Sequence, residues 1–97
     1  MSRKVAETSS PEGITVVLSE SRLAHIVAGH ENLAGHVDEI LATVQEPSLR
    51  FDDVRPGRER FYGLEKGPQR WLVVVVEFTS TPAFIVTAFA DDADPLT

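Results

Sequence analysis

Three histidines cluster in the first half of the chain and are the first residues that could carry chemistry. They are His25, His30 and His36, and the chain has no others. An imidazole titrates near neutral pH, so it can give or take a proton, and it is also a common metal ligand. The cluster therefore predicts either acid–base chemistry or a metal site. Cysteine is absent, which leaves no thiolate for nucleophilic attack or metal binding.

The spacing of the histidines argues against a zinc site on a helix. Such a site places two histidines four residues apart, and Ala34 stands four residues after His30. A loop site that joins all three histidines remains an alternative. On a continuous helix His25 and His30 lie about 140° apart and do not share a face. His30 then falls on the apolar stripe, where it could simply close the helix, and His36 is expected at the surface.

A cationic and aromatic face is predicted for the strand over residues 58–64. Side chains alternate along a strand, which places Arg58, Arg60 and Tyr62 on one face and Glu59, Phe61 and Gly63 on the other. Phe61 is expected to face the core. Guanidinium groups match phosphate oxygens, and an aromatic ring can stack on a base. The alternative is a solvated strand face with Glu59 and Asp53 as ion-pair partners.

One hydroxyl, that of Thr87, interrupts the apolar run over residues 84–89. It is either a half-buried filler or a hydroxyl delivered to a cleft. Together with imidazoles and arginines, it would suffice for RNA cleavage without a metal. In that reaction the 2′-OH attacks the adjacent phosphate, a base and an acid move protons, and cations stabilise the phosphorane charge. The carboxylate cluster that magnesium favours is missing at these positions, so we expect no metal or cofactor.

The elements that must position these residues follow from hydrophobic periodicity. Ser19 is a candidate N-cap, Gly29 a candidate helix end, and Pro47 ends a second helix. Period-two alternation then replaces the helical period, with short turns between the runs. The predicted elements are a flexible tail over 1–13, a strand over 14–18, helices over 19–29 and 33–44, and strands over 49–51, 58–64, 71–78 and 83–90.

These elements predict an α+β fold, with two N-terminal helices packed on a three- to four-stranded antiparallel sheet. At 97 residues, the chain has room for a single core, which we place over residues 14–90, followed by an acidic tail over 91–97. The first residues lack the apolar stretch of a signal peptide, and no apolar run is long enough to span a bilayer. We therefore expect a cytoplasmic protein with no membrane partner.

The net charge of −6 argues against general attraction to nucleic acid. Its distribution is uneven, because Asp91, Asp92 and Asp94 lie together near the end of the chain, whereas residues 50–70 carry a local excess of arginine and lysine. A basic strip inside an acidic protein is the expected surface.

Short matches along residues 22–90 resemble the barnase, EndoU, colicin and RelE-like (BECR) nuclease superfamily, in particular its phage and mobile-element branch. The matching segments are His25-Ile26, His30, Thr43-Val44-Gln45-Glu46-Pro47, Arg60-Phe61-Tyr62, Leu72-Val73-Val74-Val75 and Val86-Thr87-Ala88-Phe89. The resemblance implies a BECR-like two-layer fold with an RNA cleft on the sheet. It also implies that His25 or His30 exchanges protons, that Arg60 steadies the phosphate, and that Tyr62 and Thr87 bind or orient it.

The sequence thus predicts a metal-independent endoribonuclease, such as a toxin or a mobile-element effector, with RNA as substrate and a cognate antitoxin or immunity protein as partner. Its catalytic residues would be His25, His30, Arg60, Tyr62 and Thr87, with Arg58 and Arg22 binding substrate. The alternative is a non-catalytic binding or regulatory module of the antitoxin or immunity kind. The acidic balance favours it, and so does Asn32, which stands where the superfamily pattern has a glutamate.

Overall fold

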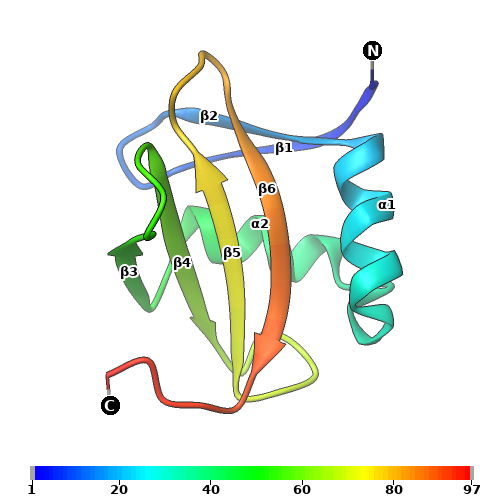
Figure 1. Cartoon of the computed structure of the whole chain (residues 1–97), viewed down its shortest axis with the longest axis vertical. Helices are drawn as coiled ribbons and strands as arrows, with labels where there is room; N and C mark the ends of the chain where they lie inside the picture. The colour runs from blue at the N-terminus through cyan, green and yellow to red at the C-terminus, as the bar shows by residue number, and fades with distance from the viewer. Residues whose placement is uncertain (1, 97) are drawn as a thin grey trace.

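A six-stranded sheet and two α-helices make up the fold (Figure 1). The computed structural model describes residues 2–96. The elements in chain order are β1 (Lys4–Ser9), β2 (Thr15–Ser19), α1 (Glu20–Gly29), a 3-10 turn (Glu31–Leu33), α2 (Val37–Gln45), β3 (Leu49–Asp52), β4 (Arg58–Leu64), β5 (Trp71–Glu77) and β6 (Ala83–Asp91). Within residues 2–96, no helix is long and apolar enough to cross a membrane.

The order of the strands corrects the predicted fold class. The sheet runs β1-β2-β6-β5-β4-β3, and it is mixed because β2 and β6 are parallel whereas all other neighbours are antiparallel. The expectation of two helices on a three- to four-stranded antiparallel sheet was wrong, because it left out the hairpin of β1 and β2. The antiparallel order from β3 to β6 agrees with the predicted meander.

Strand β1 forms where the sequence indicated a flexible tail over residues 1–13. Its turn into β2 is fixed by the buried Ser10, whose hydroxyl accepts a hydrogen bond from the Ile14 amide at 3.1 Å, while its carbonyl accepts from Gly13 at 2.9 Å. Gly13 has a φ of 87°, which a glycine adopts without strain. Ala6 packs against the core, so this polar segment is ordered by turn chemistry and pairing that its composition does not reveal.

The first helix matches its prediction and the second begins later. The Ser19 hydroxyl caps α1 by accepting from the Arg22 amide at 3.2 Å, and α1 ends at Gly29. The predicted start of the second helix at residue 33 was wrong, because a 3-10 turn and Gly35, with a φ of 85°, intervene before Val37. Ile40 and Val44 on α2 are buried, as the apolar stripe predicts.

The core lies between α2 and one face of the strands β4, β5 and β6. Phe61, Val74 and Ala88 face α2 and are fully buried. Helix α1 packs on β6 and β2, and in Figure 1 it stands beside β6, where no strand follows β2. The arrangement covers one face of the meander with α2 and flanks its other face with α1.

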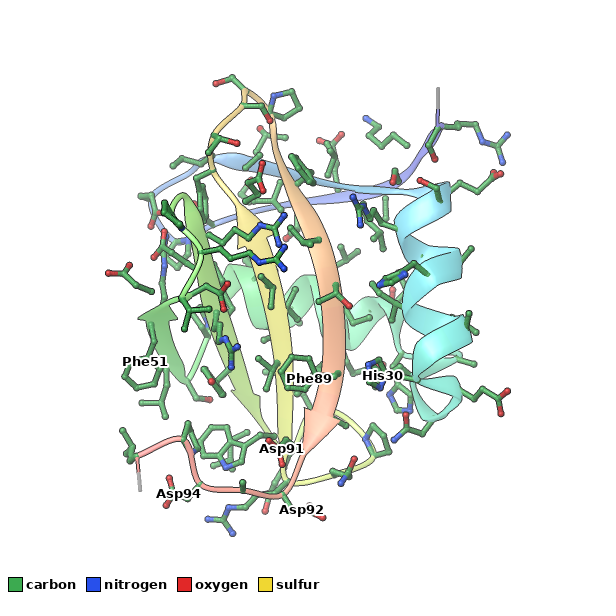
Figure 2. All side chains as sticks on the ribbon, viewed as in Figure 1. His30, Phe51, Phe89, Asp91, Asp92 and Asp94 are labelled. Carbon is green, nitrogen blue, oxygen red and sulfur yellow. The ribbon has the colours of Figure 1, made fainter. Side chains whose placement is uncertain are left out.

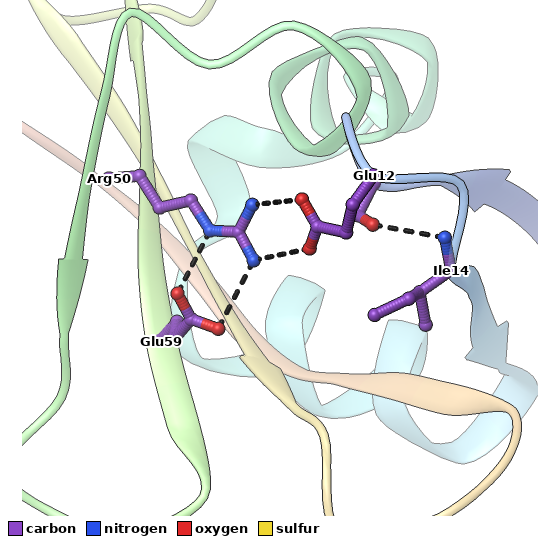
Figure 3. Close-up of polar contacts among 5 residues, drawn as sticks. Glu12, Ile14, Arg50 and Glu59 are labelled. Atoms are coloured by element: carbon purple, nitrogen blue, oxygen red, sulfur yellow. Dashed lines mark hydrogen bonds and ion pairs between the residues drawn. The ribbon is translucent and has the colours of Figure 1, made fainter.

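A cluster around Arg50 joins the two ends of the sheet (Figure 3). Arg50 on β3 donates two hydrogen bonds of 2.7 Å to Glu12 in the turn between β1 and β2. It also donates to Glu59 at 2.9 and 3.1 Å, and its guanidinium lies 4.4 Å from the centre of the Phe61 ring. The hydrogen bonds from Arg50 lower the pKa of Glu12 to about 2. We call the Glu12–Arg50 pair the hairpin latch.

The acidic segment predicted as a tail is partly built into the sheet. Asp91 is the last residue of β6, and Asp92 accepts hydrogen bonds from the Arg70 amide at 3.0 Å and from Gln69 Nε2 at 3.1 Å. The Arg70 amide lowers the pKa of Asp92. Asp92 therefore fixes the loop that precedes β5.

Candidate functional site

The face of β4–β6 that points away from α2, which we call the open face, brings several predicted site residues together. Strand pairing arranges its side chains in three rows across the sheet. The rows are Arg58–Glu77–Phe84, Arg60–Val75–Thr87 and Tyr62–Val73–Phe89. Val73 and Val75 are buried, so they form a floor between the longer side chains of β4 and β6.

A bulge in β6 decides that Thr87 belongs to this face. Val75 pairs with Thr87, but the next residue, Val76, pairs with Ile85, so β6 holds one extra residue, Val86. In a regular strand Ile85 and Thr87 would share a face. The bulge lets Ile85 enter the core and places the half-buried Thr87 in one row with Arg60.

Arg60 is held by a carboxylate through a single nitrogen. Its Nε donates to Asp53 Oδ1 at 2.7 Å, and the Asp53 side chain is only 8% exposed. The pair lowers the pKa of Asp53 and raises that of Arg60, and Tyr62 adds to the second effect. Because Nε makes this bond, the terminal nitrogens of the guanidinium stay outside the ion pair. They can still donate to a phosphate.

Arg58 has the same arrangement one row away. Its Nε donates to Glu77 Oε1 at 2.8 Å, and Glu77 also accepts from the Thr79 hydroxyl at 2.6 Å. The pKa of Glu77 is lowered by Thr79 first, then by Arg58, and also by the charge of Arg22 on α1. The predicted ion pair between β4 and Asp53 exists for Arg60, whereas Glu59 pairs with Arg50 instead.

Two of the three histidines lie on or next to the helix that flanks the open face. His30 follows α1, and its ring centre lies 6.1 Å from that of Phe89 on β6 (Figure 2). His25 is exposed and follows Arg22 by three residues, so the two side chains are neighbours on the helix. Helix α1 thus runs along β6, with Arg22 near the first row and His30 beside the third.

His36 lies away from this face. It occupies the N-cap position of α2, where its Nδ1 is 3.3 Å from Glu39 Oε1, and its side chain is half-buried rather than fully at the surface as predicted. Among the described residues 2–96, no three histidine, aspartate or glutamate side chains are grouped so that they could hold a metal ion. The alternative of a loop site made by all three histidines is therefore wrong.

Phe51 is a residue of this region that the sequence analysis missed. It pairs with Arg60 across β3 and β4 on the open side of the sheet, and it is 39% exposed. Its ring centre lies 5.6 Å from that of Tyr62 in an edge-to-face contact. The alternation of Leu49 and Phe51 along β3 was the available signal, but the face of so short a strand is set by its partner.

None of the protein-family models, curated proteins or solved structures compared with this chain matches it. The chemistry of the site therefore has to be argued from its own residues. Two oriented guanidinium groups, a hydroxyl and a phenol face an apolar floor, and imidazoles stand on the flanking helix. This set can bind a phosphodiester and can move protons beside it.

Proposed function

We propose that this protein is an endoribonuclease that cleaves RNA by attack of a 2′-OH on the adjacent phosphate, with the open face as its substrate site. The observation that carries the proposal is the row Arg60–Val75–Thr87, which sets a guanidinium and a hydroxyl on either side of a small floor residue. Neighbouring strands lie about 4.8 Å apart, so the two backbones are about 10 Å apart. A phosphate group fits between the two side chains.

The arginines would bind the scissile phosphate and stabilise the phosphorane charge. Arg58 and Arg60 are each fixed at Nε by a carboxylate, so little side-chain freedom is lost when their terminal nitrogens meet phosphate oxygens. Thr87 and Tyr62 supply further hydrogen-bond donors from the same face. Stabilisation of developing charge by preorganised donors is the largest contribution in many such reactions.

Proton transfer would fall to His30 and His25. His30 lies beside Phe89 in the third row, at the border of the open face, and His25 is on the exposed side of α1. A histidine can take the proton of the 2′-OH or give one to the leaving 5′-oxygen. Arg22 adds a third guanidinium near Glu77.

The acidic net charge does not prevent binding at this face. Around the first two rows, the three guanidinium groups of Arg22, Arg58 and Arg60 outnumber the two carboxylates of Asp53 and Glu77. The acidic residues Asp91, Asp92 and Asp94 gather at one end of the sheet (Figure 2). We infer that a polyanion is held over the rows of arginine and repelled from that end.

The same residues carry the resemblance to the BECR nuclease superfamily, and we propose membership of it, with a role as a toxin or mobile-element effector. A cognate antitoxin or immunity protein would then be the natural partner. The wider charge pattern, acidic at one end and basic over the rows, suits both an RNA and a protein that imitates its charge.

The test is cleavage of a defined single-stranded RNA in EDTA by the parent protein and by Arg60→Ala, with Arg55→Ala as the matched control. Arg55 is an exposed arginine in the loop before β4, outside the open face. We expect the parent and Arg55→Ala to cut the RNA and Arg60→Ala to lose at least about 100-fold in rate. Intact RNA with the parent protein, or equal rates for the two variants, would overturn the proposal. Intact RNA together with a stable protein complex would favour the binding module.

A further inference from the structure

An exposed aromatic ring stands directly beside the proposed phosphate site. Phe51 is 39% exposed although its neighbours on the sheet are half-buried or buried, and it faces the same side as its strand partner Arg60. Directly paired residues have side chains about 5 Å apart at their Cβ atoms. We propose that Phe51 is a stacking platform for a nucleobase of single-stranded RNA, for the nucleotide adjacent to the phosphate that Arg60 binds. This inference rests on the proposed function for the identity of that phosphate.

The ring of Phe51 is held in place by two other rings. Tyr62 meets it edge to face with centres 5.6 Å apart, and Trp71 in turn meets Tyr62 edge to face with centres 6.1 Å apart. Trp71 is 7% exposed and anchors the series at the start of β5. Edge-to-face contacts leave the outer ring oriented and one of its surfaces available. A fixed ring loses little entropy when a base stacks on it.

The charges around Phe51 favour a nucleotide over an apolar protein side chain. Its paired neighbour is a guanidinium whose terminal nitrogens lie outside the bond to Asp53. The adjacent carboxylates do not oppose a phosphate there, because Asp53 is committed to Arg60 and Asp52 points to the opposite side of β3. A base over the ring and a phosphate at the guanidinium would satisfy both groups at once.

The experiment measures the binding of a fluorescein-labelled hexathymidylate, which lacks the 2′-OH and cannot be cleaved by this route. The variants are Phe51→Ala, Phe51→Leu and Phe51→Trp, with Leu64→Ala as the matched control. Leu64 is 41% exposed, lies on β4, and contributes no ring. We expect Phe51→Ala to raise the Kd about 10-fold, within the range measured for loss of one base stack. Phe51→Trp and Leu64→Ala should stay within about twofold of the parent.

Two further arms identify what is lost. Phe51→Leu keeps apolar area but not the aromatic face, so it should resemble Phe51→Ala if a base stacks there and resemble the parent if the contact is only hydrophobic. A scan of single abasic positions should find one position where the loss equals that of Phe51→Ala and does not add to it. Thermal unfolding of each variant confirms that it is folded.

The outcomes separate this inference from the proposed function. If RNA is cleaved but Phe51→Ala binds like Leu64→Ala, the stacking inference is wrong and the nuclease proposal stands. If no RNA is cleaved but the abasic scan and Phe51→Ala coincide, the base platform stands and the nuclease proposal fails. Absence of measurable binding by the parent, or binding unaffected by any abasic position, would overturn the inference.

Discussion

Replacement of Glu12 by glutamine should break the hairpin latch and make stability depend less on pH. Arg50 holds Glu12 with two hydrogen bonds of 2.7 Å, and these lower its pKa from 4.5 to about 2. Because the carboxylate is favoured in the folded state, the latch stabilises the fold above pH 4.5. That contribution is lost as the pH falls toward 2, where Glu12 becomes protonated even in the folded protein.

The magnitude follows from the same pKa. A change from 4.5 to about 2 corresponds to about 3.4 kcal/mol if no screening is considered. The Glu12 side chain is 42% exposed and that of Arg50 25%, so solvent reduces the figure to about 1 kcal/mol. Arg50 keeps its second partner, Glu59, in the variant, which prevents an unpaired buried cation.

The assay is urea unfolding of the parent, Glu12→Gln and the charge-matched control Glu31→Gln between pH 7 and pH 3. Glu31 is exposed at the start of the 3-10 turn. We expect Glu12→Gln to lose about 1 kcal/mol of unfolding free energy at pH 7 and to approach the parent as the pH drops below 4.5. Equal stability of the two variants at pH 7, or a difference that persists unchanged at pH 3, would refute the reasoning.

Three further predictions concern the cap, the core and the arginine clamp. Ser19→Ala removes the hydroxyl that caps α1 and should cost about 1 kcal/mol in urea unfolding, whereas Ser19→Asp should restore the cap. A Cβ at Gly63 would lie 2.5 Å from Thr43 Oγ1, so Gly63→Ala should cost about 1–3 kcal/mol, and Thr43→Ala in the same chain should recover part of it; simple additivity would contradict this contact. Asp53→Asn should raise the KM for RNA more than it lowers kcat if Asp53 only positions Arg60, and an unchanged KM would exclude that role.

Local signals in the sequence predict much of the fold. The Ser19 cap and Gly29 delimit α1, and the alternation over residues 58–64 gives β4 with its bounds and its two faces. Both features depend on neighbours within a few residues. The same holds for β5 and β6, whose apolar runs are bounded by turns.

Non-local pairing explains what the sequence leaves out. Residues 4–9 are polar, and they form a strand only because the Ser10 turn brings them against β2 and places Ala6 on the core. The parallel contact of β2 with β6 rests on two residue pairs across the whole chain. Neither has a periodic signal of its own.

The candidate site divides in the same way. The common face of Arg58, Arg60 and Tyr62 follows from alternation alone. The position of Thr87 depends on the bulge at Val86, which a simple alternation would miss. The carboxylate partners of the arginines and the exposure of Phe51 become visible only with the strand pairing.

The central claim is that the open face cleaves RNA through the 2′-OH, and the chemistry of the product ends tests it most directly. The parent protein is incubated with one single-stranded RNA and with the same strand carrying a single 2′-deoxy substitution at the cleaved position. The account predicts a 2′,3′-cyclic phosphate on the upstream fragment and no cut in the substituted strand. An uncut RNA, or a substituted strand cut at the same position, would contradict it.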